Sequence, residues 1–138
     1  MSKPETTFTA GVHKYLPSGR EKPYWMKNNN IYTAGIWDVW YSGDAADLWV
    51  EYKFIVLPKR DGTMIEPDLS ALQLKWGADR HTEGRNLAVI IGCKEGGIIM
   101  RDLDWENPIS TADFRHDLLS RKELAERIIG FTQKGAAL

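Results

Sequence analysis

Apolar runs rich in β-branched and aromatic residues, separated by polar turns, predict β-strands through the middle of the chain. Strands are predicted at residues 34–41 and 48–57, and the turn-like Ser42-Gly43-Asp44 between them predicts a hairpin. Both faces of the 48–57 segment are mostly apolar, so this strand should be central and covered on both sides. A short, fully apolar strand is expected at 87–91, followed by a last strand at 98–101.

Helix start signals occur at three places in the chain. Ser2 and Glu5 have the spacing of a capping box with proline in the first turn, and Ser120 and Glu123 repeat that spacing. Another helix is predicted to begin near Ser70. With a strand at 22–28, the predicted order is α-β-β-β-α-β-β-α in one domain. The first two helices should cover residues 2–16 and 70–81, with inward stripes of Phe8, Val12 and Tyr15 and of Leu69, Leu72 and Trp76.

The composition narrows the class of protein. The chain has 138 residues, 43% of them hydrophobic, which suits a single domain with a core of its own. Cys93 is the only cysteine, which excludes an internal disulfide framework and a cysteine-based zinc cluster and fits a reducing cytosol. The apolar run at 87–91 is far shorter than the roughly 18 residues that span a bilayer. The N-terminus lacks the apolar core of a signal peptide, so a cytoplasmic protein without a membrane partner is expected.

Charge is distributed unevenly along the chain. Residues 1–30 contain five Lys or Arg and two acids, a net charge of +3, whereas residues 31–112 contain eight and thirteen, a net charge of −5. This pattern is consistent with phosphate binding in one place and metal binding in another, although ordinary surface scatter is the more frequent cause of such a pattern. The residues predicted to bind DNA phosphates are Arg20, Lys22, Lys27, Lys59 and Arg60.

Charged side chains interrupt the two apolar strands of the hairpin. Glu51 and Lys53 share one face of the central strand, and Asp38 lies within the strand before it. Isolated buried charges cost several kcal/mol, so they must be paired, hydrogen-bonded or bound to a metal. Glu5 shares a helix stripe that should face the sheet, and Gln73 lies on the inward side of the next helix. Taken singly, Glu51 and Lys53 suit an ion pair, Glu5 suits a helix cap and Gln73 suits a helix edge. Together with Asp38 they predict a functional site.

The chemistry that such a set supports is metal-assisted hydrolysis of a phosphodiester bond. Asp38, Glu51 and the carbonyl of Tyr52 are oxygen ligands suited to Mg²⁺, for which Mn²⁺ should substitute. The cation would lower the pKa of a bound water and neutralise charge that grows on the phosphate. Lys53 would orient that water and stabilise the transition state. No organic cofactor is expected.

The motif Gly35-Ile36-Trp37-Asp38, followed by Trp49-Val50-Glu51-Tyr52-Lys53-Phe54, resembles the signature of the PD-(D/E)XK nuclease superfamily. Trp37 stands where the motif usually has proline. The wider pattern, including Leu69-Ser70-Ala71-Leu72-Gln73 at a helix start, is similar to the small stand-alone VRR-NUC nucleases of phages and bacteria. The resemblance covers about residues 4–101 of the single domain and leaves a C-terminal helical extension at about 102–138; the loop at 58–67 is long for the family.

The resemblance implies an α/β (α+β) fold with a restriction-endonuclease-like αβββαβ core, a central mixed sheet flanked by helices. It implies Glu5, Asp38 and Glu51 as metal-site acids, with Lys53 and Gln73 as catalytic companions. It also implies a homodimer that cuts branched DNA such as Holliday junctions, in a bacterial cell or a phage-infected host. Candidate dimer residues are Trp40, Trp105 and Phe131. Two alternatives stay open: a site-specific homing or restriction-like endonuclease, and a non-catalytic DNA-binding module of the same fold.

Overall fold

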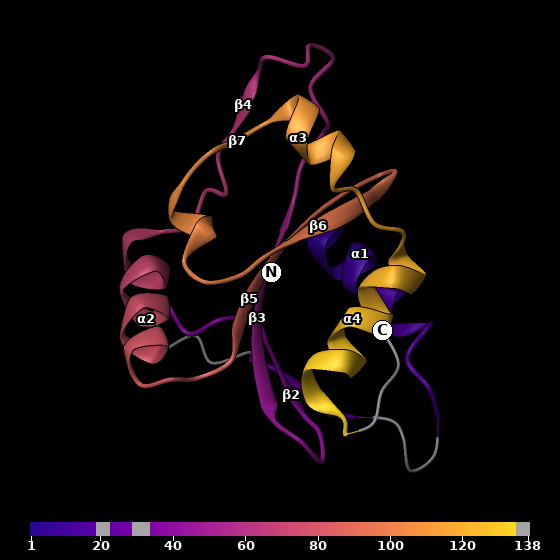
Figure 1. The fold of residues 1–138 in the computed structure, drawn as a ribbon, viewed down its shortest axis with the longest axis vertical. Coiled ribbons are helices and arrows are strands. Elements are labelled where there is room, and N and C mark those ends of the chain that lie inside the picture. Colours follow the sequence, from indigo (N-terminus) through magenta and orange to yellow (C-terminus); the bar gives the residue numbers. More distant parts are fainter. Residues whose placement is uncertain (19–22, 29–33, 135–138) are drawn as a thin grey trace.

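A five-stranded mixed sheet forms the centre of the computed structural model, which describes residues 1–18, 23–28 and 34–134 (Figure 1). The strands lie in the order β1-β2-β3-β5-β6. β3 and β5 run parallel, and the other neighbouring pairs are antiparallel. The strand bounds are β1 (Tyr24–Lys27), β2 (Val39–Ser42), β3 (Asp47–Phe54), β5 (Leu87–Cys93) and β6 (Gly96–Met100).

Helices cover both faces of this sheet (Figure 1). α1 (Lys3–His13) and α4 (Arg121–Thr132) lie on one face, and α2 (Ala71–Thr82) lies on the other. Each helix opens with the capping box or capping serine that its sequence predicts, at Ser2, Ser70 and Ser120. The expected fold class, a central mixed sheet flanked by helices, is therefore confirmed.

β3 is the central strand, and its alternating side chains feed two separate cores. Leu48, Val50 and Tyr52 are fully buried against α1 and α4. Trp49, Glu51 and Lys53 point to the α2 face, where β5 contributes apolar neighbours in parallel register. The prediction of a strand covered on both sides is confirmed, and it explains how Glu51 becomes almost completely buried.

The chain also contains elements that the sequence analysis did not predict. Within the predicted 58–67 loop, β4 (Met64–Ile65) pairs with β7 (Ile109–Ser110) in a second, two-stranded sheet. The short helices η2 (Asp104–Glu106) and α3 (Thr111–His116) flank β7. Thr111 fixes this sheet because its N–H and hydroxyl both donate to the carbonyl of Thr63.

Several local predictions were wrong in instructive ways. The first helix ends at His13, not near residue 16, so Tyr15 is half exposed. Leu72 is also exposed, because Leu74 is the leucine of α2 that packs on the sheet. The predicted strand at 22–28 is the shorter edge strand β1, in which more than a third of the surface of Trp25 is exposed. Trp105 is buried in the core beneath α2, so it is no dimer contact.

Candidate active site

Asp38 stands immediately before β2, because the preceding segment leaves the sheet. The sequence pattern predicted a strand from residue 34, but Gly35 adopts φ +90°, and a Cβ there would lie 2.8 Å from the carbonyl oxygen of Leu72. Trp37 turns under α2, where it is fully buried and its Nε1 donates to the Gln73 carbonyl oxygen at 3.1 Å. The segment thus runs under the first turn of α2 and delivers Asp38 to the sheet.

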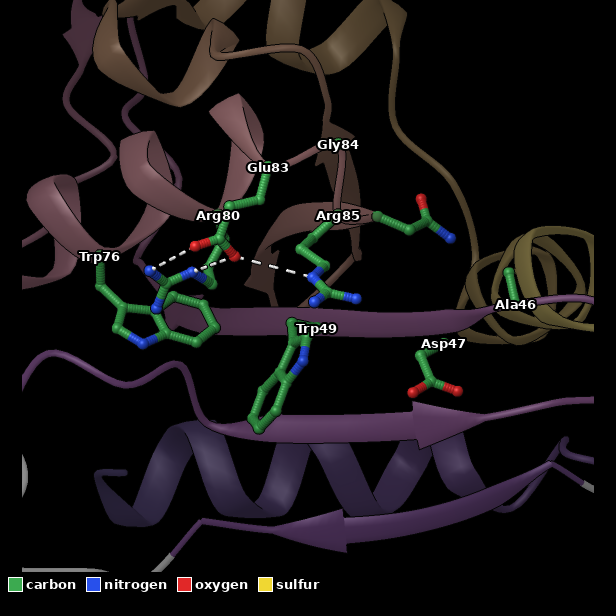
Figure 2. A pocket seen from close by; sticks show the side chains of 9 residues that line it. Ala46, Asp47, Trp49, Trp76, Arg80, Glu83, Gly84 and Arg85 are labelled. Atoms are coloured by element: carbon green, nitrogen blue, oxygen red, sulfur yellow. Dashed lines mark hydrogen bonds and ion pairs between the residues drawn. The ribbon is translucent and has the colours of Figure 1, made fainter.

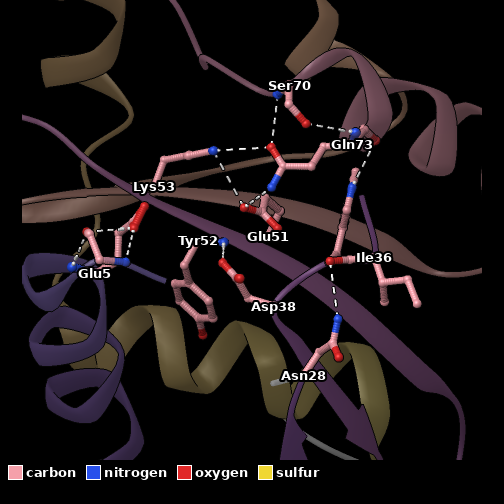
Figure 3. A network of polar contacts seen from close by, with 11 residues as sticks. Glu5, Asn28, Ile36, Asp38, Glu51, Tyr52, Lys53, Ser70 and Gln73 are labelled. Atoms are coloured by element: carbon pink, nitrogen blue, oxygen red, sulfur yellow. Dashed lines mark hydrogen bonds and ion pairs between the residues drawn. The ribbon is translucent and has the colours of Figure 1, made fainter. Parts of the chain in front are cut away.

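Asn28, the residue after β1, holds the other side of this segment. The backbone N–H of Asn28 donates to the carbonyl of Asp38 at 2.7 Å, and its side-chain Nδ2 donates to the carbonyl of Ile36 at 3.5 Å (Figure 3). Asn28 and Trp37 therefore both position the Asp38 backbone. Neither was singled out for this role from the sequence, although Trp37 was noted for replacing proline.

Gln73 joins the helix cap to the charged residues of β3 (Figure 3). Its side-chain Oε1 accepts from the Ser70 N–H at 2.9 Å and from Lys53 Nζ at 3.3 Å. Its Nε2 donates to Glu51 Oε2 at 2.9 Å. Lys53 Nζ also lies 3.6 Å from the same Glu51 oxygen. One amide thus completes the capping box of α2 and orients both the acid and the base of the Glu51-x-Lys53 motif.

Tyr52 connects Asp38 to β3 through its backbone. The pairing of β2 with β3 ends at Val39 and Val50, so the next residues of β3 have no strand partner on the β2 side. The Tyr52 N–H instead donates to Asp38 Oδ2 at 3.2 Å. Because the N–H and C=O of one strand residue face the same neighbour, the Tyr52 carbonyl also faces the Asp38 side. This places the predicted carbonyl ligand beside the carboxylate.

Burial destabilises the charged form of both carboxyl groups. Burial, followed by the negative charge of Asp38, raises the pKa of Glu51 to about 8, although Lys53 opposes the shift. Burial also raises the pKa of Asp38 above its usual value, against the opposing effect of the Tyr52 N–H. Glu51 is only 2% exposed, so water cannot relieve this repulsion.

These residues fit a divalent cation. Glu51 Oε1 is buried and accepts no hydrogen bond from the described residues. A buried carboxylate oxygen without a donor calls for an explanation, and a hard cation with oxygen ligands supplies one. Asp38, Glu51 and the Tyr52 carbonyl are the groups that would hold it. Within residues 1–18, 23–28 and 34–134, no three side chains of His, Cys, Asp or Glu lie close enough together to form a metal site by themselves.

Glu5 lies near the site but serves its own helix. Its Oε2 accepts from the N–H of Ser2 at 2.9 Å and from the Ser2 hydroxyl at 2.7 Å. Its charge nevertheless helps to raise the pKa of both Asp38 and Glu51. The structure therefore assigns Glu5 to the capping box, and its part in metal binding stays a prediction.

Glu5→Gln separates these two roles, because the amide oxygen still accepts from Ser2 while the negative charge is lost. We expect the affinity for Mg²⁺ or Mn²⁺ to fall on the order of tenfold, by loss of a nearby negative charge. Thermal stability without metal should hold. Isothermal titration and thermal melts measure the two quantities. Glu123→Gln, at the same capping-box position of α4, is the matched control; identical behaviour of the two variants would leave Glu5 a cap alone.

The residues predicted to bind DNA lie in different parts of the chain. Arg20 and Lys22 fall outside the described residues. Lys27 ends β1 and pairs in register with Val39, next to Asp38. Lys59 and Arg60 are exposed on the segment between β3 and β4. Lys27 thus lies beside the site, and Lys59 and Arg60 follow the strand that carries Glu51. None of these three forms a hydrogen bond or an ion pair with the site carboxylates.

Comparison with known proteins finds a similar fold among solved structures. No protein-family model matches the chain, and no curated protein matches it. Among solved structures, the chain is similar to Hjc of Archaeoglobus fulgidus, a Holliday junction resolvase from an archaeal hyperthermophile, with a TM-score of 0.51 and 13% identity over 88% of this chain and 99% of that one. The chain shares the Hjc fold. At this identity the likeness concerns fold, and the resemblance to VRR-NUC nucleases stays a prediction. The helices of the described segments are too short or too polar to cross a membrane.

Proposed function

We propose that the protein is a Mg²⁺-dependent DNA endonuclease of the PD-(D/E)XK type. The observation that carries the proposal is the convergence of Asp38, Glu51, Lys53 and Gln73 around a buried carboxylate oxygen that has no donor. Asp and Glu-x-Lys in this arrangement constitute the superfamily's signature, and the Hjc-like fold supports the assignment. Intact acids and lysine argue against a module that has lost cleavage.

Each residue has a distinct part in the proposed reaction. Asp38, Glu51 and the Tyr52 carbonyl would hold the cation, which would supply an activated water and neutralise phosphate charge when bound. Lys53, fixed by Gln73 Oε1 and Glu51 Oε2, places a positive charge beside the scissile phosphate. Gln73 is a positioning residue, because it holds both Lys53 and Glu51 while α2 holds Gln73.

The proposed substrate is branched DNA, cut by a homodimer. The fold shared with a Holliday junction resolvase supports this choice, and paired incisions need two sites, which a two-fold dimer supplies. Lys27, Lys59 and Arg60, with Arg20 and Lys22 from the sequence, are the proposed phosphate contacts. Such contacts position the duplex without reading its sequence.

Cleavage assays test the proposal directly. The protein is incubated with a four-way junction, a linear duplex of the same arm sequences and a plasmid, each with Mg²⁺, Mn²⁺ or a chelator. We expect metal-dependent cleavage of the junction, at least about tenfold faster than cleavage of the linear duplex. Folded protein that cuts none of the three DNAs with either cation would contradict the proposal. Cutting at one position of a long linear DNA would favour the site-specific alternative.

A further inference from the structure

A hollow of about 690 Å³ lies at the C-terminal end of α2, on the same face of the sheet as Glu51 (Figure 2). Gln73 lies in the first turn of α2, and Arg80, which lines the hollow, follows seven residues later. At 1.5 Å per residue the hollow is therefore about 10 Å along the helix from the carboxylates. The residues at its wall are Ala46, Asp47, Trp49, Trp76, Arg80, Glu83, Gly84, Arg85 and Asn86.

Two indole rings form the apolar wall of this hollow (Figure 2). Trp49 and Trp76 meet edge to face, with ring centroids 5.3 Å apart and planes at 71°. Trp76 is held from below by the buried Trp37, 5.7 Å away, and the Arg80 guanidinium lies 5.4 Å from its ring centre. Both rings are half-buried. They are thus fixed by the core while part of each remains open to the hollow.

The aromatic surface continues from the hollow toward the sheet edge. Trp40 lies across from Trp49 in register, with centroids 6.3 Å apart, and Tyr24 lies 5.8 Å from Trp40. Tyr24 is 62% exposed, and its neighbour on the same face, Met26, is 49% exposed. α2 packs over β5, and none of the described helices contacts this part of the face. We call Tyr24, Trp40, Trp49 and Trp76 the aromatic row.

Arginines border the hollow. Arg80 Nε and Arg85 Nε lie 2.9 and 3.6 Å from the same oxygen of Glu83. Arg101 donates to the side chain of Asn86 from behind the wall, where its guanidinium lies over the Phe131 ring. Among the described residues that line the hollow, Arg80 and Arg85 balance the charges of Asp47 and Glu83. Partly exposed aromatic rings with arginines beside them are a combination that suits unpaired nucleotides, because bases stack on the rings while cations contact the phosphates.

We propose that the hollow and the aromatic row bind unpaired nucleobases of the strand that is cut. This inference rests on the proposed function and narrows its substrate to branched DNA with single-stranded nucleotides at the branch. Because the hollow is about 10 Å along α2 from Gln73, the bound bases lie within a few nucleotides of the scissile phosphate.

Binding without metal tests the inference separately from cleavage. Fluorescence anisotropy with labelled twelve-nucleotide oligo-dT and with a blunt duplex of the same length is measured for wild type and Trp49→Ala. We expect the variant to lose about tenfold or more in oligo-dT affinity, with duplex affinity unchanged and with Trp49→Phe restoring most of the loss. Trp25→Ala is the matched control, since Trp25 is a partly exposed tryptophan on the opposite face, against His13.

Each other outcome is decisive. Equal oligo-dT affinity of Trp49→Ala and wild type would overturn the inference, as would parallel losses for oligo-dT and duplex. A change of Trp49→Ala from dimer to monomer in sedimentation, with oligo-dT binding intact, would show that a second copy covers the row. Oligo-dT binding that depends on Trp49, in a protein that cuts no DNA, would uphold the inference while the proposed function fails.

Discussion

Asp38→Ala, Glu51→Ala and Lys53→Ala are each expected to lower the rate of junction cleavage by at least a hundredfold while leaving DNA binding nearly intact. The acids supply the proposed cation ligands, and Lys53 is held beside them by a hydrogen bond to Gln73 and an ion pair with Glu51. Removing one preorganised electrostatic group commonly costs about 10²–10³ in rate. Single-turnover cleavage in Mg²⁺ and anisotropy in a chelator measure the two properties.

Lys75→Ala and Asp79→Ala are the matched controls for these variants. They break an exposed ion pair on the outer side of α2, in the same region of the fold but away from the site. Both should cut DNA at the wild-type rate. An Asp38 variant that cut nearly as fast as wild type would show that the site lies elsewhere.

The metal-free protein is expected to lose stability as pH rises from about 5 to 8. The pKa of Glu51 is about 8 in the folded protein against a usual value of 4.5, and the pKa of Asp38 is raised as well. Between those values the unfolded chain releases a proton that the folded chain retains, so the free energy of unfolding falls as pH increases. The loss should be on the order of 2–4 kcal/mol at pH 8, given 1.36 kcal/mol per pKa unit.

Glu51→Gln should largely abolish this fall, because the amide has the same shape and no charge. Its oxygen still accepts from Gln73 Nε2, and its NH₂ group can replace the oxygen that lacks a donor. Urea unfolding at pH 5, 6, 7 and 8 with a chelator measures the effect. Mg²⁺ should raise the free energy of unfolding of wild type at pH 8, and it should not raise that of the variant. A flat profile for wild type, or a less stable variant at pH 8, would contradict the assigned electrostatics.

The features that the sequence predicted are those with a local signal. Ser2, Ser70 and Ser120 each stand three residues before a Glu or Gln, and each begins a helix at the expected residue. Glu51 and Lys53 could be placed on one face because their strand is regular. Gln73 could be linked to them because a helix start fixed its position.

The features that escaped prediction depend on contacts between distant residues. The turn of the chain at Gly35 and Trp37 is set by α2, which begins more than thirty residues later. β4 has only two residues, and its partner β7 lies beyond β5 and β6. Glu5 has two possible roles in the sequence, and only its hydrogen bonds with Ser2 show that the fold uses it as a helix cap. The periodicity of apolar residues in the sequence contains no signal for any of these contacts.

The parallel pairing of β3 with β5 bears on how the protein reaches its active form. Glu51 lies opposite Val89 in this pairing, so the strand that carries the site finds its partner only after a long loop has closed. On the face opposite Glu51, β3 packs against α1 and α4, which come from opposite ends of the chain. Contacts of such sequence separation form slowly in folding. During synthesis Glu51 would therefore remain hydrated until β5 has paired with β3, even though the β2–β3 hairpin already brings it near Asp38, and the proposed site would be complete only late in folding.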